Sequence, residues 1–322
     1  MTGKFSYVKA TSIKAAVTEA ARPGAHILAG GTDLLGCLRE EVFPASTVVS
    51  ISGLKELKGI TQTAAGVRIG ALTTLTEVAE NKLLREQYPL LAQAAAAAAS
   101  PQLRNQGTIG GNLCQRPRCW YFRGDFHCLR KGGDTCFAAA GRNEFHCIFG
   151  GAPCFIVHPS DTAPALVALD ARVTIAGPRR TRTIPLASFF VLPSENVQKE
   201  NVLAPGELVT EILLGPAPAG ARSKYRKVRE RGAFDFAMAS AAVLLSLSGG
   251  AVSSARIVLG GVAPKPWRVE EAEKALVGKP LNAAAIAQAA EAAVKGAFPL
   301  SENEYKIHLV RGILEETLTS LA

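Results

Sequence analysis

The sequence predicts an α+β protein with more than one domain. Its 322 residues suffice for about two or three ordinary hydrophobic cores, and 48% of them are apolar while 20% are charged, as in globular proteins. Three observations predict the fold class. They are a strand–helix–strand pattern near the N-terminus, an alanine-rich helical stretch before residue 101, and a change of composition near Arg222 followed by strand-like runs and helices.

Residues 1–55 are predicted to form a small βαβ unit. Its predicted elements are a helix over residues 13–21, capped by Thr11 or Ser12 and ended by Pro23-Gly24, and strands over residues 26–29 and 47–51. The first strand runs into Gly30-Gly31-Thr32-Asp33. This turn gathers backbone N–H groups and adds a hydroxyl, as an anion site requires. By itself, a Gly-Gly turn is also an ordinary tight loop between a strand and a helix.

Residues 56–220 are predicted to form a second unit with both strands and helices. The predicted elements are a strand over residues 66–72, a helix capped by Thr73 or Thr74, a helix over residues 82–100 stopped by Pro101, a helix over residues 162–169, strands over residues 171–175 and 182–185, and a turn over residues 204–208. Asp161 precedes the last of these helices, where its carboxylate would either cap the helix or bind a sugar hydroxyl.

Residues 221–322 are predicted to form the last domain. The predicted elements are strands over residues 237–247 and 255–259, and helices over residues 266–277, 281–294 and 301–321. Gly278 would end the first of these helices. Ser301 followed by Glu304 has the spacing of a capping box, which predicts the start of the terminal helix.

The stretch from residue 105 to residue 161 is the part of the chain around which the rest is organised. It opens with a glycine-rich run in which Thr108 and Asn112 can add side-chain donors to an anion cradle. Its middle carries six of the seven cysteines and has no long apolar periodicity. Such a segment cannot order itself by burying apolar surface, so it needs cross-links such as metal–thiolate bonds or disulfides. Thiolates around a metal centre are the first candidate, and zinc or disulfides are the alternatives, because no Cys-x-x-Cys pair is present.

The charge distribution favours an anionic cofactor or an acidic partner surface. The net charge is +9, and its densest part is residues 222–231. Nucleic-acid binding would require a basic face with stacking aromatic residues, and only Tyr225 is close by, so we expect no nucleic acid. No apolar run reaches membrane-spanning length, so we expect no membrane span. Residues 1–6 contain no hydrophobic signal region. We therefore expect synthesis in the cytoplasm, with export to the periplasm only through a signal on a partner.

Several motifs stand in a fixed order along the chain. They are Ala29-Gly30-Gly31-Thr32-Asp33-Leu34-Leu35, Thr108-Ile109-Gly110-Gly111-Asn112-Leu113, Ser160-Asp161, Tyr225-Arg226-Lys227-Val228-Arg229 and Val258-Leu259-Gly260-Gly261-Val262-Ala263. Each is common alone, but the ordered set resembles the FAD-binding subunit of the molybdenum hydroxylases, which include xanthine dehydrogenase, carbon monoxide dehydrogenase and aldehyde oxidoreductase. The resemblance covers nearly the whole chain. It implies a two-lobed FAD-binding domain of the PCMH type, followed by a smaller C-terminal domain with an antiparallel sheet and helices.

The resemblance also implies a set of FAD-binding residues. They are Ala29, Gly30, Gly31, Thr32, Asp33, Leu34, Gly107, Thr108, Gly111, Asn112, Gln115, Ser160, Asp161, Leu208, Arg226 and Lys227. The two glycine-rich motifs would hold the diphosphate and ribityl parts from two sides. Ser160 and Asp161 would lie on the adenosine ribose side, and Leu208 near the adenine. Either Arg226 or Lys227 would lie near the flavin, where a cation favours the anionic reduced ring.

The cysteine-rich insert narrows the resemblance. A minority of the family carries an insert that holds a [4Fe–4S] cluster, and the spacing of this one looks like the periplasmic aldehyde oxidoreductase type. The implied ligands are Cys119, Cys128, Cys136 and Cys154. Arginine and lysine residues among them would ease ionisation of the thiols.

The remaining cysteines and the histidines receive other interpretations. Cys147 is the first substitute if one of the four ligands is wrong, while Cys114 and Cys37 are expected to be small buried side chains. His127, His146 and His158 could bind metal, but loop or capping positions are the commoner outcome for histidine.

By this resemblance the chain is an electron-transfer subunit with no catalytic residue of its own. It would bind FAD and one [4Fe–4S] cluster, and its partners would be a [2Fe–2S] subunit, a molybdenum-cofactor subunit and an external electron acceptor. An alternative is the beta subunit of an enzyme like 4-hydroxybenzoyl-CoA reductase. A second alternative is a non-catalytic scaffold whose cysteines bind zinc. The substrate and the acceptor stay open.

Overall fold

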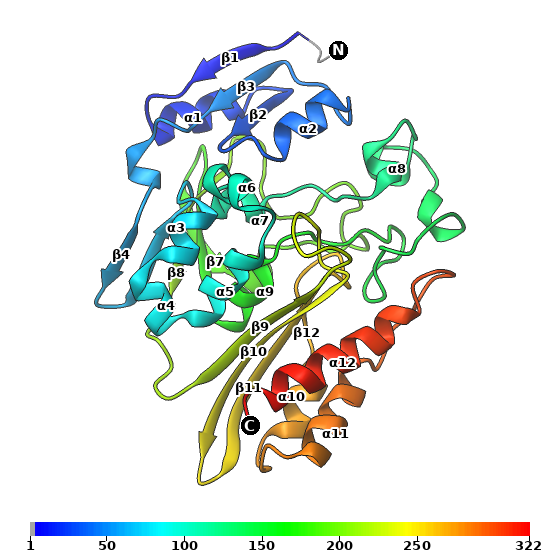
Figure 1. Cartoon of the computed structure of the whole chain (residues 1–322). Coiled ribbons are helices and arrows are strands. Elements are labelled where there is room, and N and C mark those ends of the chain that lie inside the picture. The colour runs from blue at the N-terminus through cyan, green and yellow to red at the C-terminus, as the bar shows by residue number, and fades with distance from the viewer. Residues whose placement is uncertain (1–3) are drawn as a thin grey trace.

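The chain builds three β-sheets that follow one another down the molecule (Figure 1). The computed structural model describes residues 4–322, so the first three residues of the N-terminal stretch discussed above lie outside it. The N-terminal sheet is parallel, with strand order β1-β3-β2. Its elements are β1 (Ser6–Lys9), α1 (Ile13–Ala20), β2 (Ala25–Leu28), α2 (Leu34–Arg39) and β3 (Thr47–Ser50). Ser12 caps α1, as one of the two predicted candidates, whereas β1 was not predicted.

The middle sheet is antiparallel and has five strands. In spatial order they are β4 (Ile60–Thr63), β5 (Gly66–Gly70), β8 (Leu208–Leu214), β6 (Arg172–Ala176) and β7 (Thr181–Pro185). The sequence analysis missed β4 and β8. The turn expected over residues 204–208 is too long by one residue, because Leu208 already pairs with Ala176 as the first residue of β8. No residue of β8 is fully exposed, so β8 lacks the alternation of buried and exposed residues that marks a strand with one face in solvent.

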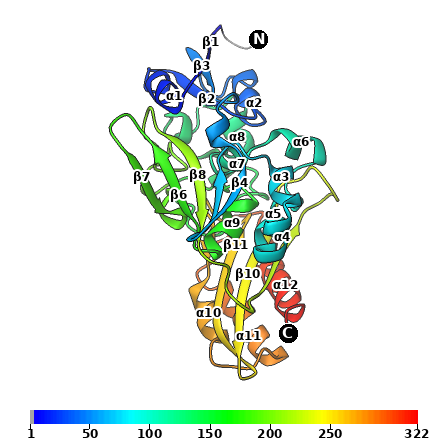
Figure 2. The same cartoon turned by 90° about the vertical axis from the view of Figure 1, so that its left-hand side faces the viewer.

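Short helices pack against this sheet on the side shown in Figure 2. They are α3 (Leu75–Glu80), α4 (Lys82–Gln87), α5 (Pro89–Ala97), α7 (Ile109–Leu113) and α9 (Thr162–Ala168), while α6 (Pro101–Gln106) buries no residue and lies against α3. Thr74 and Glu77 form a capping box at the start of α3, so Thr74 is the cap. The single helix expected over residues 82–100 is wrong. Pro89 divides it, because a proline pushes the residue before it, Tyr88, out of the helical region.

The cysteine-rich stretch lies beside the other layers as irregular chain. It contains one helical turn, α8 (Trp120–Arg123), and two short 3₁₀ turns, η2 (Leu129–Lys131) and η3 (Phe137–Ala139). Phe122 and Cys128 pack with Cys37 of α2. Further along, Ile148 and Phe149 enter the core of the C-terminal domain. This stretch therefore connects the N-terminal sheet with the C-terminal sheet.

The C-terminal sheet is antiparallel and is covered on one face by three helices (Figure 1). Its elements are β9 (Arg222–Val228), β10 (Ala239–Ser248), β11 (Ala251–Gly260), β12 (Trp267–Arg268), α10 (Glu270–Leu276), α11 (Ala283–Ala293) and α12 (Tyr305–Thr319). The helix expected from residue 266 begins later, because Trp267 and Arg268 pair with β11. The capping box at Ser301 is also wrong, since the Ser301 hydroxyl accepts a hydrogen bond from Asn143 Nδ2 and α12 starts at Tyr305.

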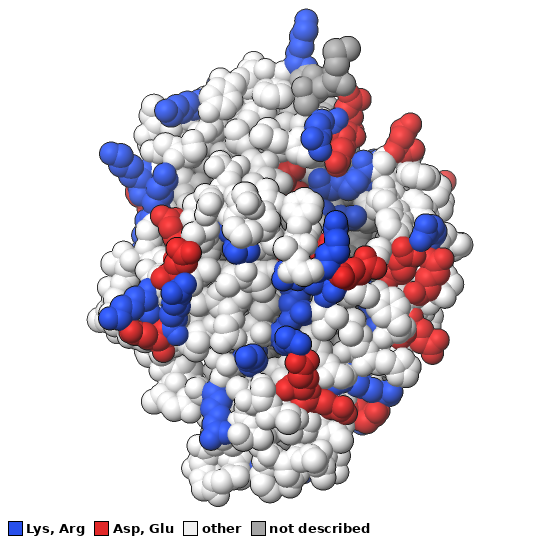
Figure 3. Space-filling model, in the orientation of Figure 1, with Lys and Arg blue, Asp and Glu red and all other residues white. Residues whose placement is uncertain are grey.

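The α+β prediction, with an antiparallel sheet and helices in the C-terminal part, is confirmed. On the face shown in Figure 3, Lys and Arg side chains stand among Asp and Glu side chains. In the described part of the chain, no helix combines the length and the apolar character needed to cross a bilayer.

Candidate functional site

The two predicted glycine turns touch each other where β2 ends and α6 gives way to α7. A side-chain carbon on Gly30 would lie 2.0 Å from the carbonyl oxygen of Gln106, so no other residue fits at position 30 without moving backbone. Gly31 has a φ of 76°, which also favours glycine. Gly107 lies against Thr32, because a side-chain carbon added at Gly107 would be 3.6 Å from Thr32 Oγ1. Two segments far apart in the sequence therefore form one backbone-lined surface.

A pocket opens over this surface, and we call it the glycine-loop pocket. It encloses about 1030 Å³, counting the part open to solvent, which is at the upper end of the size of small-molecule sites, about 300–1,000 Å³. The predicted residues that line it are Ala29, Gly30, Gly31, Thr32, Asp33, Leu34, Thr108, Gly111 and Leu208. Arg116 lines it as well.

Three predicted residues stand just outside the lining and hold it in place. Asn112 Oδ1 accepts hydrogen bonds from the hydroxyls of Ser160 and Thr162, each at 2.6 Å. Gln115 Nε2 donates to the carbonyl oxygen of Asn112. Gly107 lies against the Gly30 turn, since a carbon added at Gly30 would be 3.4 Å from Gly107 Cα. Asn112 thus ties the second glycine turn to the start of α9.

Asp33 lies where the glycine-loop pocket ends. Its carboxylate accepts a hydrogen bond from the backbone N–H of Arg116 at 2.8 Å and pairs with the guanidiniums of Arg118 and Arg123. Burial raises the pKa of Asp33, but the two arginines and the backbone N–H outweigh burial and hold its pKa below the usual value. The carboxylate is therefore ionised and neutralised, so it does not repel an anion in the pocket.

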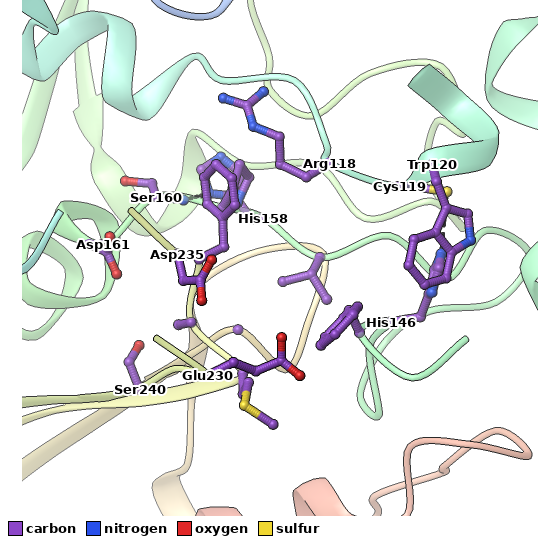
Figure 4. A pocket seen from close by; sticks show the side chains of 17 residues that line it. Arg118, Cys119, Trp120, His146, His158, Ser160, Asp161, Glu230, Asp235 and Ser240 are labelled. Atoms are coloured by element: carbon purple, nitrogen blue, oxygen red, sulfur yellow. Dashed lines mark hydrogen bonds between the residues drawn. The ribbon is translucent and has the colours of Figure 1, made fainter. Parts of the chain in front are cut away.

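A second pocket lies on the far side of Arg118, and we call it the central pocket (Figure 4). It encloses about 1050 Å³, counting its open mouth, and lies between the cysteine-rich stretch and the turn before β10. Ser160 and Asp161 are at one end of it, and Cys119 with Trp120 at the other. Since Asp33 belongs to the glycine-loop pocket and Arg118 to the central pocket, their ion pair marks the boundary between the two.

Asp161 does not cap α9. Asp161 stands at the N-cap position, but its side chain makes no capping hydrogen bond, and the Ser160 hydroxyl instead accepts one from the backbone N–H of Ala163 at 3.0 Å. The Asp161 carboxylate instead accepts hydrogen bonds from Tyr225 and Lys227, both at 2.8 Å. Burial raises the pKa of Asp161 more than Lys227 and Tyr225 lower it. The carboxylate is thus a buried polar group fixed at the floor of the central pocket.

The structure separates the two basic residues that the sequence left undecided. Successive side chains of a strand point to opposite faces, and Lys227 points from β9 toward Asp161, with its side chain only 3% exposed. Arg226 points the other way, pairs with Glu316 of α12 and has a side chain that is 48% exposed. Only Lys227 reaches the predicted binding residues.

The four predicted cluster ligands line one small cavity, which we call the cysteine cavity. Cys119, Cys128, Cys136 and Cys154 face it together with Arg130 and His146. Cys114 and Cys147 do not line it. Cys154 hydrogen-bonds to Cys136, which lowers the pKa of the Cys136 thiol below its ordinary value and raises that of Cys154. Burial, together with the charges of Cys154 and Cys128, raises the pKa of Cys119 to about 11. The four thiols are therefore close enough to act on one another.

A single ion and an iron–sulfur cluster place different demands on their cysteine ligands. Within residues 4–322, no three His, Cys, Asp or Glu side chains are placed to hold one metal ion. A single zinc ion draws its ligands to one point, with Zn–S distances of about 2.3 Å. A [4Fe–4S] cluster takes one thiolate at each iron corner and needs its cysteines further apart. Four thiols around one cavity match the number of thiolates that such a cluster takes.

The cysteine cavity and the central pocket share a wall. Cys119 and His146 line both, and His146 Nε2 lies 3.2 Å from Cys119 Sγ. Burial, together with the charge of Lys306, lowers the pKa of His146 to about 4. The imidazole is therefore neutral at pH 7.

Comparison with known proteins decides the family. A sequence model described as "FAD binding domain in molybdopterin dehydrogenase" matches residues 3–217, and one described as "CO dehydrogenase flavoprotein C-terminal domain" matches residues 223–321. The chain belongs to the FAD-binding medium subunits of the molybdenum hydroxylases. The resemblance inferred from the motifs is confirmed, and with it the assignment to the oxidoreductases.

Individual relatives of this FAD-binding subunit match over most of its length. The "Aldehyde oxidoreductase FAD-binding subunit PaoB" of Escherichia coli K12 is 38% identical over 98% of this chain and 97% of its own. The "Carbon monoxide dehydrogenase medium chain" of Hydrogenophaga pseudoflava is 29% identical over 90% of this chain and 86% of its own. A solved structure of carbon monoxide dehydrogenase from that organism aligns with a TM-score of 0.80 at 28% identity, covering 100% of this chain and 98% of that one.

One residue of the subunit's site was missed entirely by the sequence analysis. Glu200 is 5% exposed and binds Arg130 of the cysteine cavity and Arg116 of the glycine-loop pocket. It lies in irregular chain before β8, where no periodicity or motif marks a single glutamate. Only contacts between distant segments reveal it.

Proposed function

We propose that the chain is the FAD- and [4Fe–4S]-binding electron-transfer subunit of a molybdenum-containing aldehyde oxidoreductase. In this proposal it passes electrons from a [2Fe–2S] subunit to an external acceptor, and the substrate reacts on a separate molybdenum-cofactor subunit. The observation that carries the proposal is the cysteine cavity, whose four thiols line one space and share a wall with the central pocket. The aldehyde assignment is supported by the name and the 38% identity of the Escherichia coli relative.

The proposed FAD site spans the glycine-loop pocket and the central pocket. The two pockets adjoin at the Asp33–Arg118 ion pair, so the two ends of one FAD molecule can lie in different pockets. The glycine-loop pocket suits the diphosphate, because glycine backbone leaves N–H groups accessible and the neutralised Asp33 adds no repulsion. Leu208 gives it an apolar wall.

The central pocket would take the other end of the cofactor, which supplies one- and two-electron transfer when bound. Asp161 would offer a carboxylate backed by the buried ammonium of Lys227, and Ser160 a hydroxyl. Lys227, rather than Arg226, is then the cation that favours a reduced, anionic ring. Because Lys227 binds Asp161, we place Ser160 and Asp161 at the flavin end as well, whereas the resemblance implied the adenosine ribose side for them.

We divide the subunit, as part of the proposal, into two FAD-binding lobes over residues 1–55 and 56–220 and a C-terminal domain over residues 221–322. The cysteine-rich insert over residues 114–156 then belongs to the second lobe. Cys119, Cys128, Cys136 and Cys154 are its proposed cluster ligands. Arg130, buried beside Cys154, supplies positive charge to the same space.

The proposal is tested by metal, sulfide and flavin analysis of the purified complex. The expected result is one flavin, four irons and four acid-labile sulfides in this subunit, beyond the iron of its [2Fe–2S] partner. Reduction of a dye by aldehyde should bleach the flavin absorbance. A colourless subunit that contains zinc and no sulfide would overturn the proposal. Turnover of hydroxybenzoyl-CoA without any aldehyde oxidation would move the chain to the aryl-CoA reductase branch.

A further inference from the structure

The inference starts from a buried row of three charged side chains, Arg116, Glu200 and Arg130. Glu200 Oε1 lies 2.6 Å from Arg130 Nη1, and Glu200 Oε2 lies 2.9 Å from Arg116 Nε. The Arg130 side chain is 1% exposed and the Glu200 side chain is 5% exposed. Charges are seldom buried so deeply without a partner, and one carboxylate here serves two guanidiniums.

The two ends of this row belong to different sites. Arg116 lines the glycine-loop pocket, where its guanidinium also stacks over Phe122 at 4.8 Å and Phe43 at 5.4 Å. Arg130 lines the cysteine cavity. Glu200 is therefore a single buried anion between the two proposed cofactor sites.

Arg130 is not saturated by Glu200. Its Nε and Nη2 are buried and have no partner in regular hydrogen-bond geometry within residues 4–322, and the guanidinium reaches the thiol of Cys154, whose pKa it lowers. An unsatisfied buried donor is costly, by about 1–3 kcal/mol. Thiolate and sulfide acceptors in the cavity would satisfy these two N–H groups.

We propose that Arg130 and Glu200 are positioning residues that set the reduction potential of the cluster, an inference that rests on the proposed function. One-electron reduction adds negative charge to the cavity. In a low-dielectric interior, the neighbouring guanidinium stabilises that charge and raises the potential. Glu200 offsets part of this effect, so it lowers the potential. The two residues act with opposite signs, which a purely structural role would not produce.

The experiment is a redox titration of the purified complex with dithionite, followed by the electron paramagnetic resonance signal of the reduced cluster. Arg130→Met should lower the midpoint, and Glu200→Gln should raise it. Each shift should reach at least a tenfold change in the oxidised-to-reduced ratio at fixed potential, which is 59 mV for one electron. Arg130→Lys keeps the charge and should stay closer to the parent protein than Arg130→Met.

Arg142→Gln is the matched control. Arg142 lies on the same cysteine-rich stretch and also pairs with a glutamate, Glu144, but its side chain is 71% exposed. Solvent screens such a charge, so the midpoint should not move. Iron, sulfide and flavin are quantified in every variant, so that a lost cluster is not mistaken for a shifted one.

The outcomes separate the inference from the proposed function. A parent complex without iron and sulfide in this subunit removes both. Parent and variants with full iron but the same midpoint overturn the inference alone. If Arg130→Met loses its cluster, the sign of the shift in Glu200→Gln decides. Cluster loss in Arg130→Met, Arg130→Lys and Glu200→Gln alike would show that the row only holds the cavity together, and the inference would be wrong.

Discussion

Lys227 and Asp161 form a buried ion pair, with 2.8 Å between Lys227 Nζ and Asp161 Oδ2, and Asp161 lines one end of the central pocket. The pair joins the edge strand of the C-terminal sheet to the start of α9. Tyr225, two residues earlier on the same face of β9, donates to the other carboxylate oxygen at 2.8 Å. One carboxylate therefore fixes the position of the C-terminal sheet relative to the proposed flavin end of the site.

Replacing Lys227 by Met should release flavin and destabilise the fold. Breaking a buried pair by removing one partner costs roughly 3–5 kcal/mol, because the other charge stays buried without compensation. The measurement is the flavin-to-protein ratio after gel filtration, with urea unfolding for stability. Arg226→Met is the neighbouring control on the exposed face of β9. It should leave the flavin-to-protein ratio unchanged and alter the free energy of unfolding by no more than about 0.5 kcal/mol. Equal flavin loss in both variants would contradict the assignment of Lys227.

Replacing Gly30 by Ala should push the two glycine turns apart. The new carbon would lie 2.0 Å from the carbonyl oxygen of Gln106, which is backbone and cannot swing away. We expect a loss of about 1–3 kcal/mol of stability, as for other overpacked sites, together with weaker flavin binding. Flavin fluorescence on dilution and the thermal midpoint measure the two effects.

Gly36→Ala is the control for this glycine, because its added carbon in α2 would meet nothing nearer than Arg123 Nη1 at 3.9 Å. An alanine in a helix gains about 0.5–1 kcal/mol over glycine, so Gly36→Ala should keep its flavin and melt slightly higher. If Gly30→Ala also keeps its flavin, the contact between the turns does not shape the site.

Serine at any of the four cavity cysteines should remove iron and leave flavin in place. Cys119, Cys128, Cys136 and Cys154 line the cysteine cavity, and a cluster needs all four thiolates. Cys147→Ala and Cys114→Ala should keep full iron, since neither residue lines the cavity. The readout is iron per flavin. Iron loss in Cys147→Ala with retention in one of the four would exchange that ligand for Cys147.

Lys306 should make stability depend on pH above neutrality. Its side chain is fully buried and donates to the carbonyl oxygens of Phe145 and Gly261. Burial lowers its pKa to about 7 from the ordinary 10.5. Between these values the unfolded chain binds a proton that the folded chain does not, so the free energy of unfolding rises with pH, by at most about 1.4 kcal/mol per unit.

The comparison is between the parent and Lys306→Met from pH 6.5 to pH 9.5. Methionine leaves two carbonyl oxygens without this donor at every pH, which is a constant cost. The advantage of the parent over the variant should therefore grow as pH rises from about 7. A gap between the two melting temperatures that stays level or narrows over this range would show that Lys306 keeps its proton when folded.

Prediction from the sequence succeeded where local rules decide the structure. Ser12 and Thr74 cap their helices because a hydroxyl can accept a backbone N–H wherever the chain enters a helix. It failed where a distant segment decides. The first residue of β8 was predicted to belong to a turn, because the pairing of β8 with β5 and β6 cannot be seen in the local sequence. Ser301 was predicted to cap a helix, but its hydroxyl binds Asn143 instead.

The site shows the same division. The glycine turns carry their own signature, and the motif order pointed to the family, which the family models confirm. The choice between Arg226 and Lys227 needed the orientation of β9 against α9. Glu200 has no signature at all, because a single acidic residue acquires its meaning from the two arginines that the fold brings to it.

By itself, the amino-acid sequence determined the α+β class, the two glycine turns, the cysteine-rich stretch that follows them, the C-terminal domain, and the family to which the chain belongs. Only the tertiary structure decided which thiols face one cavity, which cation reaches Asp161, and that Glu200 lies between the two sites. The reason is physical: backbone preferences and capping act over a few neighbouring residues, whereas buried charges and thiols depend on side chains that folding brings together from far along the chain.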